Sequence, residues 1–435
     1  MLTFSSGRSY TDCDGTTRRN FLKAGALGTG GLSLANLLAA RSQAAEAGLP
    51  VKSTSVVWLW LGGGPTHIET FDPKMTAPSE YRSVTGETLT NIPGLTLGGY
   101  FNETAQVADK MAFVRSFAHT NSGHGGGTHF VMTGYDNRSI DNGGLPSRPS
   151  IGSIVSKVRG ANSGSTGMPT YVRLGNIGAD GPAFLGPAFA PFDPNGQARK
   201  NMNLETKVDR FDDRRELLGS LDRFRRDTDT HGLMNGLDAF EQQAFNMLLG
   251  SSSDAFSIQK ENDATRDLYG KDQLAQQMLV ARRLVEAGCG FVTVNYGGWD
   301  MHGTIEKSMQ RRAPALDHAI ASFVTDVAAR GMTEDVLLVI SGEFGRTPRI
   351  NRNAGRDHWA PLSTLALSGG KFRMGQAVGE SMPKADVPKS NPIRPQDLMA
   401  TIFHHLGLDP KLQFVNQAGR PVFVLEQGQV IAELI

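Results

Sequence analysis

Acidic and histidine side chains gather in four glycine-rich segments of the chain, each directly after a short apolar run. The first segment follows the run SVVWLWL (residues 55–61) and offers His67, Glu69 and Asp72 beyond a glycine triplet. Glycines at this point permit close approach of the backbone to an anion or a metal ion. The alternative interpretation is a tight turn whose polar side chains are solvated.

The second segment, HTNSGHGGGTH (residues 119–129), contains three of the ten histidines of the chain, together with three hydroxyl side chains, of which Ser122 and Thr128 flank the central histidine. A histidine offers a neutral nitrogen ligand, or a base that titrates near pH 7. The glycines let the backbone fold tightly around a small charged group. We therefore favour a functional segment over a flexible loop with incidental histidines.

The third segment, GGWDMHG (residues 297–303), places Asp300 and His302 two residues apart. In an extended segment, both side chains point to the same side and could bind one cation. They supply the oxygen and nitrogen ligands that zinc, manganese or iron accept. The alternative is an Asp–His hydrogen bond at a turn.

The fourth segment begins with SGEFGRTP (residues 341–348) and continues to GRDHW (residues 355–359). Glu343 stands at the end of an apolar run, and Asp357 with His358 forms a further pair of potential ligands. Arg346 could bind the oxygens of a phosphate or sulfate bidentately, or it could be a structural ion-pair partner.

Short apolar runs alternate with long helical patterns along the rest of the chain. This alternation predicts an α/β fold with a mostly parallel sheet and helices on both faces. The carboxyl ends of parallel strands share one edge of the sheet, so we expect the four segments to converge there, as a bound metal cluster requires. The expected strands are residues 55–61, 111–117, 169–174, 290–296, 335–341 and 363–367, and the expected helices are 272–287, 305–330 and 395–406.

The segment from 191 to 272 differs from its surroundings because it is charged and has a helical pattern. It indicates a helical insertion or cap on the α/β body. A disordered linker is the alternative.

The first 45 residues read as a twin-arginine signal peptide. TRRNFLK (residues 17–23) is followed by a weakly apolar, glycine-rich stretch and then by small residues around Ala45. We expect recognition by the twin-arginine export machinery and a periplasmic or exported protein. A buried helix is the alternative, although the glycines disfavour it. The α/β domain is then residues 46–435.

The composition excludes several classes of protein. The chain has 435 residues, of which 39% are hydrophobic and 20% are charged, and its net charge is +1. These values exclude a disordered chain, and the near-zero charge disfavours nucleic acid as a partner. No apolar run is long enough to predict a stable membrane span. Cleavage after Ala45 would remove Cys13, so Cys289 is expected to be a small buried residue without a disulfide.

The motifs LGGGPTHIETFDPK, HGGGTHFVMTGY, GGWDMHG, SGEFGRTPRIN and GRDHW resemble a bacterial family known as domain of unknown function 1501. The resemblance covers nearly the whole chain after the signal. That family is related to the alkaline phosphatase and sulfatase superfamily. The resemblance therefore implies a doubly wound, alkaline phosphatase-like α/β sheet that carries a site for two metal ions.

The resemblance also implies roles for individual residues. Asp300, His302 and His358 look like the ligands of one metal. Glu343 stands where the superfamily has an Asp–His pair, and the expected metal-binding Asp after the first strand is a glycine. Glu69 or Asp72, beside His67, would have to compensate, and Asp357 is a further candidate metal ligand.

The nucleophile of the superfamily precedes a Thr-Gly turn that is similar to Thr133-Gly134. Counting back by the same spacing reaches His124, which is not a hydroxyl, and Ser122 and Thr128 lie nearby. The resemblance thus leaves His124, Ser122 and Thr128 as candidates for the nucleophile or base, and Arg346 as the group that stabilises anionic oxygens.

Two classes of function follow from these features. The first is an exported hydrolase of phosphate or sulfate esters that uses one or two divalent metal ions, with zinc, manganese, calcium and magnesium all left open. Its substrate would be a small anionic ester or a sulfated or phosphorylated polymer. The alternative is a non-catalytic binding or assembly protein on a degenerate hydrolase fold. Other metal chemistry, such as isomerisation or phosphoryl transfer, is a third possibility.

Overall fold

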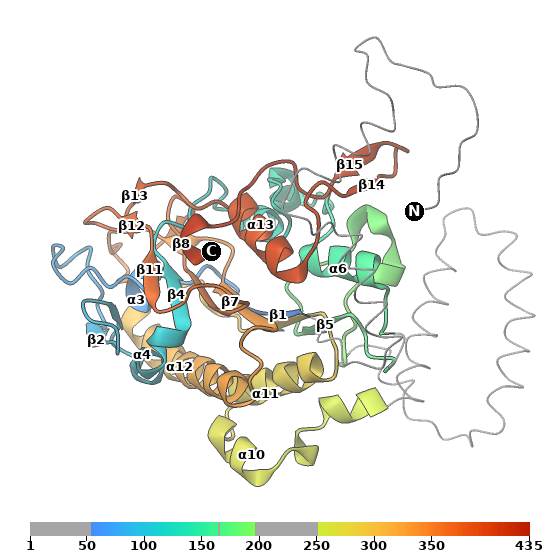
Figure 1. Cartoon of the computed structure of the whole chain (residues 1–435). Coiled ribbons are helices and arrows are strands. Elements are labelled where there is room, and N and C mark those ends of the chain that lie inside the picture. Colours follow the sequence, from blue (N-terminus) through green and yellow to red (C-terminus); the bar gives the residue numbers. More distant parts are fainter. Residues whose placement is uncertain (1–53, 164–165, 196–250) are drawn as a thin grey trace, which may run out of the picture. The chain divides into compact units, whose positions relative to one another are not determined.

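A seven-stranded sheet with the order β11-β4-β10-β7-β1-β6-β5 lies at the centre of the computed structural model (Figure 1). Only β10 runs antiparallel to its neighbours; the other pairings in the sheet are parallel. The prediction of a mostly parallel α/β sheet is therefore confirmed. The strands are β1 Ser55–Trp60, β4 Met111–Val114, β5 Tyr171–Leu174, β6 Phe291–Asn295, β7 Val336–Ser341, β10 Leu365–Gly369 and β11 Gln376–Val378.

The structure describes residues 54–163, 166–195 and 251–435. Those from 54 to 406 and from 410 to 435 belong to one unit. The predicted signal peptide (residues 1–45) lies outside the described residues, and so does most of the predicted insertion, from 196 to 250. The described end of that insertion consists of η6 (Ser251–Phe256), η7 (Ile258–Lys260) and α10 (Asp263–Tyr269).

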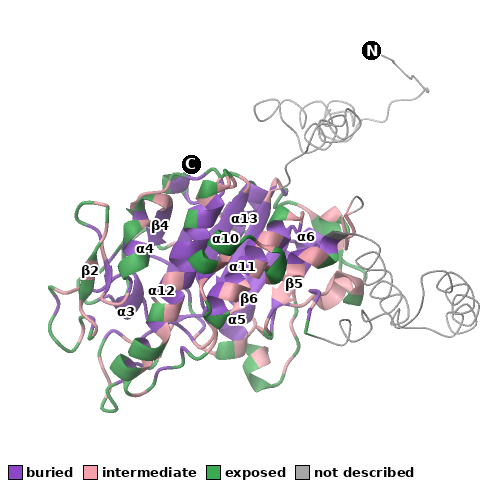
Figure 2. Ribbon diagram, turned by 90° about the horizontal axis from the view of Figure 1, so that it is seen from below, coloured by how far each residue is buried: buried purple, intermediate pink, exposed green. Residues whose placement is uncertain are grey.

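Helices cover both faces of the sheet. α11 (Gln273–Glu286) and α12 (Ile305–Ala329) lie on one face, and α6 (Ile151–Arg159) and α13 (Pro395–Leu406) lie on the other (Figure 1). Asp272 caps α11 by accepting hydrogen bonds from the N–H groups of Leu274 and Ala275, which fixes the beginning of the helix. The core fills the space between these layers (Figure 2), and every residue of β1 and β7 is buried.

Shorter elements connect these layers. They are α3 His67–Thr70, β2 Glu87–Leu89, β3 Thr96–Gly98, α4 Asn102–Gln106, η1 Ala108–Lys110, α5 His124–Thr133, η2 Arg138–Asn142, η3 Ala183–Leu185, η4 Pro187–Phe189, β8 Gly345–Arg346, β9 His358–Trp359, β12 Glu380–Ser381, β13 Pro388–Ser390, β14 Gln413–Val415, β15 Pro421–Phe423 and η8 Ala432–Leu434.

The register of the central strands aligns their carboxyl ends, where the functional residues were expected. Trp60 at the end of β1 pairs with Asn295 of β6 on one side and with Ser341 of β7 on the other. Three of the four ligand-rich segments therefore leave the sheet at the same level, side by side.

Cys289 is buried and free in the structure. Burial raises the pKa of its thiol to about 12, so the thiol stays protonated and unreactive at neutral pH. Among the described residues, no helix combines the length and apolar character that crossing a membrane requires.

Candidate metal centre

Three ligand-rich segments meet beyond the carboxyl ends of the central strands. Asp300 and His302 follow β6, His358 begins β9, and His124 is the first residue of α5. We call Asp300, His302, His358 and His124 the His/Asp cluster. Asp300 and His302 are each 46% exposed in their side chains, so the cluster is open to solvent.

Three potential metal-ligand atoms of the cluster form a nearly equilateral triangle. Oδ1 of Asp300 lies 3.0 Å from Nε2 of His302 and 3.0 Å from Nε2 of His358, and the two Nε2 atoms are 3.1 Å apart. Neighbouring ligands of a divalent ion with metal–ligand distances near 2.0–2.1 Å are separated by about 3.0–3.3 Å. The triangle therefore has the spacing of three ligands on one ion.

His124 approaches the same carboxylate from another side. Its Nε2 lies 3.5 Å from Oδ2 of Asp300. The ligand atoms of His124, Asp300 and His358 all lie within 4.8 Å of one another. The cluster thus brings three imidazoles around one carboxylate.

Each imidazole is oriented by a hydrogen bond at its other nitrogen. Nδ1 of His302 lies 2.7 Å from Oδ1 of Asp357, and Nδ1 of His124 lies 2.7 Å from Oε1 of Glu343. Nδ1 of His358 donates to the main-chain carbonyl of Ser122 at 3.0 Å. Carboxylate and carbonyl partners of this kind fix the tautomer and the ring orientation of metal-binding histidines.

This arrangement calls for a positive charge at the centre. A carbonyl oxygen only accepts hydrogen bonds, so Nδ1 of His358 carries the proton, and its Nε2 in the neutral ring is an acceptor. That Nε2 nevertheless faces Oδ1 of Asp300 and Nε2 of His302. Acceptors converging at about 3 Å repel one another unless a cation or protons lie between them. The donor set therefore fits a divalent metal ion.

Arg346 supplies part of the positive charge. Its Nη2 donates to Oδ1 of Asp300 at 2.6 Å. Although burial raises the pKa of Asp300, the hydrogen bond and the charge of Arg346 hold it well below its usual range, so the carboxylate is ionised. The Arg346 side chain is fully buried and also donates to the carbonyls of Gly63, Gly64 and Arg356. This placement favours the ion-pair role for Arg346.

Glu343 contacts His124 and is almost fully buried. Its Oε1 accepts hydrogen bonds from Nδ1 of His124 and from the N–H of Gly63 at 2.8 Å. Its Oε2 is buried without a hydrogen-bond partner in the described part of the chain. The structure therefore places Glu343 behind His124, and the hydrogen bond between them raises the pKa of His124.

The HGGG motif forms a helix rather than a loop. α5 begins at His124, and Oδ1 of Asp141, from η2, accepts hydrogen bonds from the N–H groups of Gly125 at 2.9 Å and Gly126 at 3.1 Å. A Cβ at Gly123 or Gly126 would lie 2.1 or 2.6 Å from Oδ2 of Asp141. The glycines thus admit the capping carboxylate, which holds the helix end that carries His124.

Neither hydroxyl candidate faces the cluster as a free nucleophile. Thr128 is buried, and its hydroxyl donates to the carbonyl of His124 at 2.6 Å. Oγ of Ser122 accepts a hydrogen bond from the N–H of Ala360 at 3.1 Å. The contribution of Ser122 to the cluster is its main-chain carbonyl.

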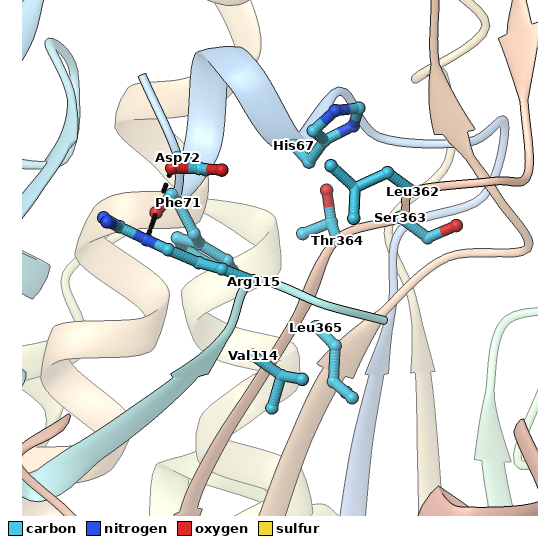
Figure 3. A pocket seen from close by; sticks show the side chains of 9 residues that line it. All are labelled: His67, Phe71, Asp72, Val114, Arg115, Leu362, Ser363, Thr364 and Leu365. Carbon is cyan, nitrogen blue, oxygen red and sulfur yellow. Dashed lines mark hydrogen bonds and ion pairs between the residues drawn. The ribbon is translucent and has the colours of Figure 1, made fainter. Parts of the chain in front are cut away.

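The carboxylates after β1 are held by cations away from the cluster. Glu69 pairs with Arg356 at 2.9 Å, and neither side chain has any exposed surface. Asp72 lies 3.5 Å from Nε of Arg115 (Figure 3) and 3.4 Å from Nζ of Lys74. Both carboxylates are therefore neutralised by basic side chains.

His67 lines the same small pocket as Asp72 and Arg115 (Figure 3). Its Nε2 donates to the carbonyl of Ala385 at 2.9 Å, and burial lowers its pKa to about 4. This histidine is a neutral buried group outside the His/Asp cluster.

Two residues that were not among the predicted site residues support the cluster. Nδ2 of Asn351 donates to Oδ1 of Asp357 at 3.2 Å and to the carbonyl of His302 at 3.0 Å. Asp141 caps α5, as described above. The fourth segment contains Asn351, so its position beside Asp357 was visible, but no sequence signal connects Asp141 to the HGGG motif.

Comparison with known proteins identifies the family. The model of a protein family of unknown function, DUF1501, matches residues 53–435. The chain belongs to this family. No curated protein matches the sequence.

The solved structures that are similar to this chain include a sulfatase, a phosphonate monoester hydrolase and a protein of the alkaline phosphatase superfamily. The PsFucS1 sulfatase from Pseudoalteromonas sp. is 13% identical, with a TM-score of 0.41 over 86% of this chain and 70% of that one. A phosphonate monoester hydrolase from Silicibacter pomeroyi is 10% identical (TM-score 0.37, 82% and 74% covered). An alkaline phosphatase superfamily protein from Vibrio parahaemolyticus is 11% identical (0.36, 83% and 68%). Because these TM-scores lie below 0.5, the activities of these proteins are not carried over to the DUF1501 chain.

Proposed function

We propose that this DUF1501 protein is an exported, metal-dependent hydrolase of phosphate or sulfate esters. The observation that carries the proposal is the His/Asp cluster, in which three Nε2 atoms turn toward Asp300 while every Nδ1 is held by an outer acceptor. Export is proposed from the twin-arginine motif at residues 17–23.

Asp300, His302 and His358 would hold the metal ion. A ligand set of two imidazoles and a carboxylate suits zinc or manganese better than calcium or magnesium, which prefer oxygen ligands. A divalent ion bound there would polarise the ester and lower the pKa of a bound water. Asp357 and the Ser122 carbonyl would keep the two histidines oriented toward it.

His124 would act as the general acid or base beside this ion. Its Nδ1 is fixed by Glu343, so its Nε2 faces the open side of Asp300 and can give a proton to a leaving oxygen or take one from water. The hydroxyls of Ser122 and Thr128 are engaged in hydrogen bonds to the main chain, so we propose water as the nucleophile.

We propose one ion and not two. The carboxylates that could have served a second ion are engaged elsewhere, since Glu69 is paired with Arg356 and Asp72 lies beside Arg115 and Lys74. Glu343 is turned toward His124.

An ester panel tests the proposal. The mature chain, loaded with zinc or manganese, is assayed with p-nitrophenyl phosphate, p-nitrophenyl sulfate and a phosphonate monoester. We expect metal-dependent release of nitrophenol that falls about 100-fold or more in His358→Ala. The matched control is His404→Ala, which removes an exposed histidine of α13. Turnover that is unchanged in His358→Ala would overturn the assignment.

A binding or assembly protein is the second candidate. Two observations favour it. The Thr128 hydroxyl is hydrogen-bonded to the main chain and is not a free nucleophile. The Arg346 guanidinium already donates to four acceptors within the protein, which leaves it without a pair of free donors for a substrate anion. A folded, metal-loaded protein that binds the esters without hydrolysing any of them would support this candidate against the hydrolase.

A further inference from the structure

Exposed basic side chains without partners collect beside the His/Asp cluster. We call them the basic surface; its members are Arg82, Lys307, Arg311, Arg349 and Arg352. None of them forms an ion pair with another residue among 54–163, 166–195 and 251–435. Many other arginines that the structure describes are engaged, as Arg173, Arg282 and Arg330 show.

Main-chain hydrogen bonds bring the parts of the basic surface together. The N–H of Ile350 donates to the carbonyl of Glu80 at 2.9 Å, which places the 349–352 loop beside the segment that contains Arg82. The N–H groups of Thr304 and Ile305 donate to carbonyls of residues 353 and 354 at 3.0 and 2.9 Å. The same loop is therefore fastened to the beginning of α12, where Lys307 and Arg311 lie on one helix face.

The basic surface is also connected to the metal ligands. Nδ2 of Asn351, between Ile350 and Arg352, donates to the carbonyl of His302 and to Oδ1 of Asp357. A polymer bound on this surface would consequently lie next to the cluster.

A hollow of about 210 Å³ opens within this surface. Its apolar lining comes from Val84, Ile305, Ile350 and Ala354, and Lys307 and Glu306 stand at its polar part. An apolar floor that has Lys307 in its lining, and Arg349 next to its lining residue Ile350, suits a ligand that alternates rings with anionic groups.

We propose that the basic surface binds a sulfated polysaccharide. Guanidinium groups match the oxygens of a sulfate bidentately, and the apolar hollow would contact the face of a sugar ring. This region holds five basic residues beside the acidic residues Glu80, Glu306 and Asp357, so positive charge is in excess here, whereas the whole chain carries a net charge of only +1. A polyphosphate chain would use the cations but would leave the apolar hollow unfilled. The inference rests on the proposed function only in treating the bound polymer as the hydrolase substrate.

Binding measurements test the inference separately from catalysis. Affinities of the mature chain for dextran sulfate, unsulfated dextran, polyphosphate and a single-stranded DNA oligonucleotide are measured by calorimetry at about 0.15 M salt. They are measured with zinc and again with chelator, so that a failed metal site does not abolish the readout. The variant is the double substitution Arg349→Glu, Arg352→Glu. The matched control is Arg373→Glu, Arg420→Glu, because these arginines are also exposed and are without an ion pair to any described residue.

We expect dextran sulfate to bind, dextran not to bind, and polyphosphate and DNA to bind more weakly. The double variant should raise the dissociation constant for dextran sulfate about tenfold or more, and the control should change it less than about twofold. An equal loss of affinity for dextran sulfate in both double variants would contradict the assignment of binding to the basic surface. Equal or tighter binding of polyphosphate would overturn the polysaccharide, and DNA as the tightest ligand would assign the surface to nucleic acid.

Discussion

Carboxylates follow both β1 and β6 at the same edge of the sheet, yet the two regions use them in opposite ways. Glu69, after β1, is completely buried against Arg356. Asp300, after β6, is half-exposed and faces three histidine nitrogens as well as Arg346. Both regions are rich in glycine and ligand-type side chains, so residue type alone does not separate them.

The difference lies in which partners the fold brings to each carboxylate. A fully buried guanidinium satisfies Glu69 and makes it part of the structure. Asp300 shares a single arginine with main-chain carbonyls, and its remaining neighbours are imidazoles that are fixed from behind. A half-exposed carboxylate that faces oriented imidazoles is a place for a cation even beside one arginine, whereas a carboxylate that is completely buried against an arginine is not.

Glu69→Gln should have the largest effect on stability. It leaves the buried charge of Arg356 without its counter-ion, which costs about 3–5 kcal/mol in the free energy of unfolding. Urea denaturation measures the loss, and Glu80→Gln, an exposed carboxylate nearby, is the control. A loss of less than about 1 kcal/mol in the free energy of unfolding would contradict a structural role for Glu69 and would remove the contrast with Asp300.

The pKa values of the histidines in the two regions should be shifted in opposite directions. Burial lowers the pKa of His67 to about 4, whereas the hydrogen bond to Glu343 raises that of His124. The unfolded chain binds a proton at His67 near pH 6.5 and the native chain does so only near pH 4, so lowering the pH through this window destabilises the fold by about 1 kcal/mol per unit. The unfolding free energy of His67→Gln should fall less steeply over this window. An equally steep fall in the variant would contradict the assignment.

Asp357→Asn should weaken metal binding without unfolding the chain. The Asp357 side chain is 52% exposed, and its carboxylate orients His302 and accepts a hydrogen bond from Asn351. Loss of such an outer carboxylate typically lowers metal affinity about 10- to 100-fold. Competition with a chromogenic chelator gives the affinity, and thermal melting of the metal-free protein serves as the control for folding. An unchanged metal affinity in Asp357→Asn would contradict a role for Asp357 in orienting His302.

Asp141→Ala should have the smallest effect, about 1 kcal/mol, because it removes a helix cap. We expect Asp141→Asn to keep most of the stability, since an amide oxygen also caps. A loss that is equal in both variants would argue against capping as the role of this residue.

Much of the fold was predictable, because apolar runs and helical periodicity place β1, β6, β7, α11, α12 and α13 within a few residues. The reversed direction of β10 was not predictable, since the residues of a buried strand carry no sign of its direction. No helix was predicted over α5, because three glycines in its first turns are atypical of a helix and the distant carboxylate of Asp141 that caps it is not visible in the local sequence.

The site was predictable in its location and less so in its roles. Carboxyl ends of parallel strands converge, which located Asp300, His302 and His358 together. The partner that removes Glu69 from the site lies 287 residues further along the chain, and Arg346 is turned to carbonyls by the same long-range packing. Such pairings depend on the tertiary fold and not on local spacing.

The most direct test of the central claim is the metal content of the folded mature chain, measured by elemental mass spectrometry after loading with zinc. The account predicts about one ion per chain in the wild type and in the folded fraction of Glu69→Gln, and strongly reduced content in His302→Ala and His358→Ala. Metal content in His358→Ala equal to that of the wild type, or a folded wild-type chain that takes up no metal, would contradict it.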